Sequence, residues 1–170
     1  MTAQTTDSIP LSRTTAAPAQ PLPHEVDYSG RIPLLILITC SLLWLAFSLF
    51  TGVFASVKMH APGMLANVGA LTYGRVAAVS SSTFLYGFAI QAGIACALWL
   101  FARLGKSYLM LPSGTIIAAL AWNIVLLIGV IEVFGGNMNQ FPTLQLPYWT
   151  ATAFFVIFIV LGLSGLLTYI

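Results

Sequence analysis

Residues 71–105 read LTYGRVAAVSSSTFLYGFAIQAGIACALWLFARLG, and the architecture of the whole chain follows from them. A short polar approach with one arginine, Arg75, leads into small residues and serines between Ala77 and Ser82. About twenty uncharged residues follow before Arg103, which is the length that an α-helix needs to cross the hydrocarbon core of a bilayer. The stretch therefore predicts a membrane helix that begins with a structured polar segment.

The composition of the chain is that of a membrane protein. Of the 170 residues, 59% are hydrophobic and only 6% are charged, whereas soluble domains carry about 25% charged residues. The formal net charge of +2 is too small and too scattered to indicate a nucleic-acid partner. Cys40 and Cys96 each lie inside an apolar run without a second cysteine at metal-binding spacing, so we expect both to be packing residues.

Four apolar runs occur along the chain, at about 32–57, 82–104, 113–134 and 148–170. Backbone in lipid has to satisfy its own hydrogen bonds, so each run is predicted to be a helix. The predicted fold class is all-α: a multi-pass membrane protein with four transmembrane helices in one domain over residues 31–170. Residues 1–30 are rich in Thr, Ala, Pro and Gln and are predicted to be a disordered tail, not a cleavable signal peptide.

Basic residues near the ends of the runs predict the orientation. Cytoplasmic segments carry the excess of lysine and arginine. The loop between the first two runs carries Lys58 and Arg75. The tail and the loop after the second run carry four basic residues, namely Arg13, Arg31, Arg103 and Lys106. Four against two predicts a cytoplasmic N-terminus.

Few side chains in the predicted spans offer chemistry. His24 lies in the tail and His60 in the first loop, where an interfacial role is the expected one. Glu132 lies about one turn from the end of the third run; we expect a solvated carboxylate at a helix end, and a functional role is the alternative. Gln91 and Asn123 lie inside spans and are predicted to form hydrogen bonds between helices. No pattern of a zinc site, a catalytic triad, a phosphate loop or paired carboxylates is present in the sequence.

Residues 71–88 resemble the start of the second helix in subunit I of the cbb-type haem–copper cytochrome c oxidases. In that family the segment reads roughly LTFGRLRPLHTNAVIFAF, and five residues of this chain are identical to it: Leu71, Thr72, Gly74, Arg75 and Phe88. The layout of runs and loops over residues 31–170 is also similar. A long first loop ends in this motif, a short basic second loop follows, and a glycine-rich third loop leads to the sequence LPYW at 146–149.

The resemblance implies a component of an oxidase-like respiratory complex in a bacterial inner membrane, with haem b, a copper site, other oxidase subunits and a c-type cytochrome as electron donor. In the family, a histidine at the start of this helix is an axial ligand of the low-spin haem. Ser80 stands at that position here, and a serine hydroxyl is not among the usual ligands of haem iron. Ala77 and Ala78 replace the family's second arginine and its proline. By resemblance, Arg75 is the residue that would contact a haem propionate.

The resemblance also implies that the copper site and the oxygen-reducing centre lie on later helices, which this chain lacks. We therefore expect the chain to supply helices around a haem pocket and not to be active alone, with a partner chain carrying the later helices. The alternative is a non-catalytic membrane scaffold or assembly protein derived from oxidase subunit I. A small transporter or channel is a weaker alternative, because Gln91 and Asn123 are thin support for a polar midplane site.

Overall fold

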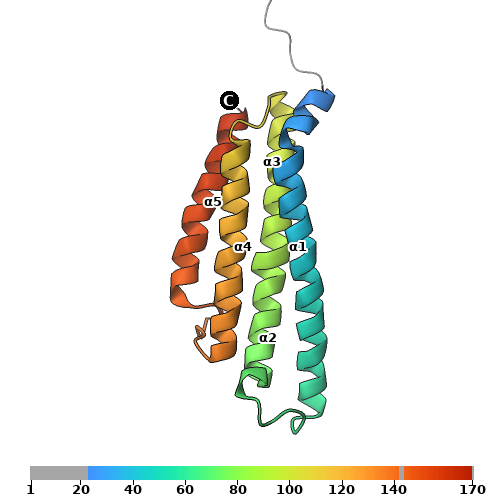
Figure 1. Ribbon diagram of the computed structural model, residues 1–170, viewed down its shortest axis with the longest axis vertical. Coiled ribbons are helices and arrows are strands. Elements are labelled where there is room, and N and C mark those ends of the chain that lie inside the picture. Colours follow the sequence, from blue (N-terminus) through green and yellow to red (C-terminus); the bar gives the residue numbers. More distant parts are fainter. Residues whose placement is uncertain (1–22, 142–143, 170) are drawn as a thin grey trace, which may run out of the picture.

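The computed structural model describes residues 23–141 and 144–169 and contains four long helical rods in alternating directions (Figure 1). The second rod is continuous but has three parts, and a short 3₁₀ turn precedes it. The elements are α1 (Pro23–His60), η1 (Gly69–Leu71), α2 (Tyr73–Ser82), η2 (Thr83–Ala89), α3 (Ile90–Gly105), α4 (Pro112–Gly135) and α5 (Tyr148–Tyr169). All four rods are long and apolar enough to cross a membrane, so the predicted all-α, multi-pass fold is confirmed.

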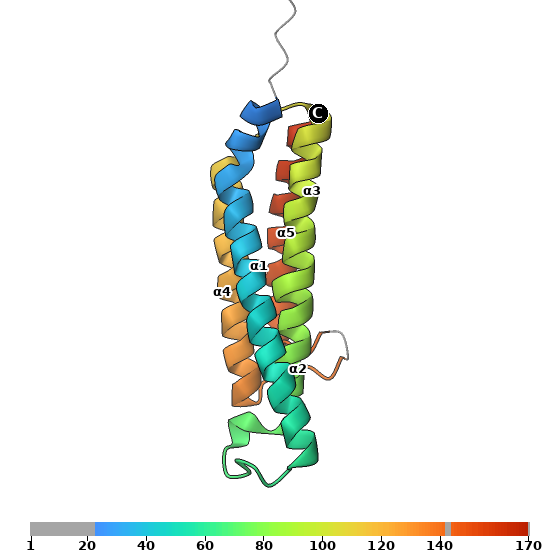
Figure 2. The ribbon, with the colours of Figure 1, turned by 90° about the vertical axis from the view of Figure 1, so that its right-hand side faces the viewer.

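The two ends of the bundle carry different segments (Figures 1 and 2). The end that we call the terminal end holds the start of α1, the loop 106–111 and the end of α5. The opposite end, called the loop end, holds the loops 61–72 and 136–147. The orientation of these ends relative to the cytoplasm stays a prediction.

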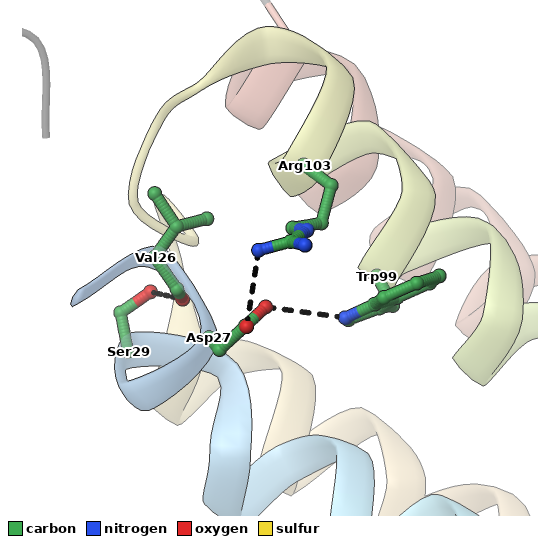
Figure 3. Close-up of polar contacts among 5 residues, drawn as sticks. All are labelled: Val26, Asp27, Ser29, Trp99 and Arg103. Carbon is green, nitrogen blue, oxygen red and sulfur yellow. Dashed lines mark hydrogen bonds and ion pairs between the residues drawn. The ribbon is translucent and has the colours of Figure 1, made fainter. Parts of the chain in front are cut away.

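Helix α1 begins at Pro23, inside the stretch that was predicted to be a disordered tail. Proline is favoured in the first turn of a helix. Long-range contacts hold the second turn in place, and Figure 3 shows those of Asp27. Asp27 accepts hydrogen bonds from Arg103 Nη1 at 3.2 Å and from Trp99 Nε1 at 3.3 Å. Ser29 Oγ accepts a hydrogen bond from the backbone N–H of Leu109 at 3.1 Å. The tail prediction is thus corrected for residues 23–30, and residues 1–22 lie outside the described part.

The middle of the second rod is a π-helix, which the sequence reasoning did not predict. In a π-helix the hydrogen bonds run from residue i to i+5, which widens the turn. Here the carbonyl of Tyr86 accepts a hydrogen bond from Trp122 Nε1 of α4 at 2.9 Å. Thr83 Oγ1 donates to the carbonyl of Val79 at 2.7 Å. Side chains therefore satisfy backbone groups around η2 and tie it to α4.

The core is centred on aromatic residues that join the second rod to α4 and α5. The centre of the Phe154 ring lies 4.4 Å from the ring centre of Trp122 and 5.3 Å from that of Tyr86, and the Tyr86 ring is nearly parallel to it. Gly87 allows α1 to approach, because a Cβ at this position would lie 2.6 Å from Cβ and Cγ of Trp44. Small residues at helix contacts are typical of membrane bundles.

Candidate functional site at the loop end

Arg75 lies half-buried near the start of α2, at the loop end. Its Nη1 donates to the carbonyl of Phe134 at 3.0 Å, one of the carbonyls that the last turn of α4 leaves without an intrahelical partner. A Cβ on Gly136, the C-cap of α4, would lie 2.6 Å from Arg75 Nη2. A positive charge at a helix C-terminus is favourable because of the helix dipole. Arg75 is therefore a cap of α4, and its remaining N–H groups are the donors that an anion could meet.

Ser80 is engaged with helix α1. Its Oγ donates to the carbonyl of Ser48 at 2.9 Å, and Ser48 Oγ donates to the carbonyl of Ser80 at 2.8 Å. The backbone of α1 is very near, because a Cβ on Gly52 would lie 3.0 Å from Ser80 Oγ. This reciprocal pair joins α1 to α2 and uses the hydroxyl as a structural hydrogen-bond donor.

The residues around Ser80 do not fit the axial ligation of a haem. Haem iron is bound by His, Met, Cys or Tyr, and the hydroxyl of Ser80 is already committed to a backbone carbonyl. The ring of His60 is exposed at the end of α1, with Nδ1 3.0 Å from the carbonyl of Ser56. Within residues 23–141 and 144–169, no group of three or more His, Cys, Asp and Glu could hold a metal ion.

Glu132 is a half-buried carboxylate that ties the third loop and α5 to the end of α4. Its Oε2 accepts a hydrogen bond from Asn137 Nδ2 at 2.7 Å, and both carboxylate oxygens lie 3.3 Å from Trp149 Nε1. The carboxylate thus lies at a helix end, as the sequence predicted. It accepts hydrogen bonds from the side chains of Asn137 and Trp149 instead of being only solvated.

The two polar residues predicted to bridge helices behave differently. Asn123 Oδ1 accepts a hydrogen bond from Trp44 Nε1 at 2.7 Å, which joins α4 to α1 and confirms the prediction for this residue. Gln91 is fully buried, and among the described residues neither Nε2 nor Oε1 has a partner. The prediction of an interhelical hydrogen bond is therefore wrong for Gln91, because its neighbours along the rod, Gly87 and Ala95, pack on apolar side chains.

An apolar pocket lies under the first loop at the loop end, close to Arg75. Its volume is about 270 Å³, and its wall is apolar apart from one threonine. The wall consists of Phe47, Phe50, Thr51, Phe54, Leu65, Leu71, Val76 and Phe134. The ammonium group of Lys58 lies 5.9 Å from the centre of the Phe54 ring, although the lysine is only 5% exposed.

Sequence reasoning used Lys58 only as a charge for orientation and did not find this pocket. A signal for it exists in α1, because the wall residues Phe47, Thr51 and Phe54 are spaced four and three residues apart. Residues at this spacing share one face of a helix. The loop residues Leu65 and Leu71 that complete the wall have no comparable periodicity.

Fold and site together define a small multi-pass helical membrane protein with a structured loop end. No family model, characterised protein sequence or solved structure matches the chain. The oxidase resemblance therefore depends on residues 71–88 and on the layout of the helices.

Proposed function

We propose that this chain is a structural membrane subunit of a bacterial inner-membrane respiratory complex that resembles the cbb-type cytochrome c oxidases. The sequence match over residues 71–88 carries the proposal. In the complex, the chain supplies helices beside a haem pocket. A partner chain holds the copper and the oxygen-reducing site, and a c-type cytochrome donates electrons to the assembly.

The contacts of Ser80 and Arg75 support a structural role in such a complex. Ser80 is hydrogen-bonded to α1, so a haem b beside this chain takes its axial ligands from the partner chain. Arg75 gives one donor to α4 and keeps others, which can form charge-assisted hydrogen bonds to a haem propionate.

A visible spectrum of the gently isolated protein tests the proposal. The chain is purified in mild detergent with the proteins that accompany it, and a reduced-minus-oxidised spectrum is combined with a pyridine haemochrome assay. We expect b-type haem in a fixed ratio to the chain in the complex, and none on the chain after the partners have been removed. A complex that retains its partners but contains no haem and consumes no oxygen would overturn the proposal.

The second candidate is a non-catalytic scaffold or assembly protein derived from oxidase subunit I. The reciprocal hydrogen bonds between Ser48 and Ser80 favour it. At the position where the oxidases have a haem-ligand histidine, this chain has a contact between two helices. The two candidates differ in where the chain is found. A subunit co-migrates with the mature oxygen-consuming complex in native gels, whereas an assembly protein co-migrates only with incomplete, inactive intermediates.

A further inference from the structure

The start of helix α1 is built from residues that form helices poorly. Residues 23–30 read PHEVDYSG, in which only Glu25 is a strong helix former. Isolated helices shorter than about 12–15 residues are marginal in water even when every residue favours the helix. The helical state of residues 23–30 therefore depends on contacts with the rest of the bundle.

Pro33 separates this segment from the rest of α1. A proline inside a helix has no N–H, so the carbonyl of Ser29, four residues earlier, loses its usual intrahelical donor. Gly30 lies in the same turn and weakens the helix further. Figures 1 and 2 show α1 bending near its start, as a proline inside a helix predicts. The backbone thus has a hinge between Ser29 and Pro33.

An exposed ion pair fastens the segment to α3 (Figure 3). Asp27 pairs with Arg103 at 3.2 Å, and their side chains are 45% and 39% exposed. The second carboxylate oxygen of Asp27 accepts a hydrogen bond from Trp99 Nε1 at 3.3 Å. Exposed ion pairs are weak and are screened by salt, so the strength of this connection depends on ionic strength.

Two more polar contacts fasten the segment to the loop 106–111. The hydroxyl of Tyr108 donates to Glu25 Oε2 at 3.2 Å, and the backbone N–H of Leu109 donates to Ser29 Oγ at 3.1 Å. Among the described side chains of residues 25–32, only that of Val26 is buried. A segment with one buried apolar side chain and exposed polar contacts opens locally at a small cost in free energy.

We infer that residues 23–32 form a strap that opens and closes as one unit about the hinge at Pro33, and that the pair of Asp27 and Arg103 holds it closed. In the open state, the strap leaves the helix and the N–H of Leu109 loses its acceptor on Ser29. Ionic strength at the membrane surface sets the balance between the two states. The strap is independent of the proposed respiratory role, because its contacts all lie within the terminal end of this chain.

Hydrogen exchange of the full chain in lipid nanodiscs, measured by mass spectrometry at single-amide resolution, tests this inference. We expect the amides of the strap to exchange together, through one opening, and faster than those of α1 after Pro33. The amide of Leu109 should exchange through the same opening. Raising the ionic strength should increase the opening constant of the strap by about threefold, the effect of screening one exposed ion pair.

Three variants separate the ion pair and the hinge from general charge. Asp27→Asn keeps an acceptor for Trp99 and removes the charge; it should raise the exchange of the strap and of Leu109 by about threefold and remove most of the response to salt. Glu132→Gln is the matched control, because it converts a carboxylate to an amide at the loop end, and it should leave both unchanged. Pro33→Ala returns an N–H to the carbonyl of Ser29 and should slow the exchange of the strap.

Three results would overturn the inference. In the first, residues 23–32 exchange one after another from the N-terminal side, which is the ordinary fraying of a helix end. In the second, Leu109 exchanges independently of the strap. In the third, Asp27→Asn and Glu132→Gln have the same effect. Circular dichroism checks that the helices of each variant are intact.

Discussion

Replacing Gln91 by methionine should stabilise the protein. Gln91 is fully buried, and neither polar atom of its amide has a partner among the described residues. A buried polar group without a partner costs about 1–3 kcal/mol. Methionine has a similar length, a flexible side chain that fills irregular spaces, and no group that requires a hydrogen bond. Taking only one of the two polar atoms as fully unsatisfied, we expect the free energy of unfolding to rise by about 1–3 kcal/mol.

The matched control is Asn123→Leu, which removes a polar side chain that does have a partner. Its Oδ1 accepts the indole N–H of Trp44 at 2.7 Å, so the substitution leaves that N–H without an acceptor. Hydrogen bonds between membrane helices are worth about 0.6–2 kcal/mol, and the free energy of unfolding should fall by about this amount. Two polar-to-apolar substitutions in the same bundle are thus expected to change the free energy of unfolding in opposite directions.

Unfolding in mixed micelles measures both variants. The purified chain is titrated with sodium dodecyl sulfate, the loss of helix is followed by circular dichroism, and the free energy is extrapolated to zero denaturant. The reasoning is refuted if Gln91→Met lowers the free energy of unfolding while Asn123→Leu behaves as expected. In that case the amide of Gln91 would have a polar partner in the membrane.

Three further substitutions test contacts of the fold with the same unfolding assay. Gly87→Ala places a Cβ 2.6 Å from the side chain of Trp44 and should destabilise the protein by about 1–3 kcal/mol through overpacking; an unchanged stability would show that α1 can move away. Gly136→Ala meets both a φ of 101° and the guanidinium of Arg75, so a loss of at least about 1 kcal/mol is expected. Asp27→Asn breaks an exposed ion pair and should cost less than about 1 kcal/mol; a larger loss would mean that this pair is coupled to other contacts.

The four apolar runs were sufficient to predict the helices, because lipid allows few other structures for a run of that length. The ends of the helices were not predictable in this way. Helix α1 begins at Pro23 because Asp27 and Ser29 meet residues that follow much later in the chain. Such contacts depend on the packed bundle, and polar residues before an apolar run carry no local sign of them.

The site followed from the sequence only in part. Arg75 stood out as the one basic residue of its motif, but its role as a cap of α4 depends on the position of Gly136, which follows it by some sixty residues. The π-helix at 83–89 and the orphan amide of Gln91 have no recognisable local pattern. The pocket at the loop end is completed by the loop residues Leu65 and Leu71, which hydrophobic periodicity does not identify.

The serine at position 80 is best understood together with the glycine that faces it. Ser80 Oγ reaches the backbone of α1 because Gly52 has no side chain, and a Cβ there would lie only 3.0 Å from this oxygen. A larger side chain at position 80 that pointed in the same direction would meet the backbone of α1 and push the two helices apart. The small residues at 52 and 80 and the hydrogen bonds of Ser48 thus form one contact, in which the close packing of α1 and α2 leaves no space for a larger side chain.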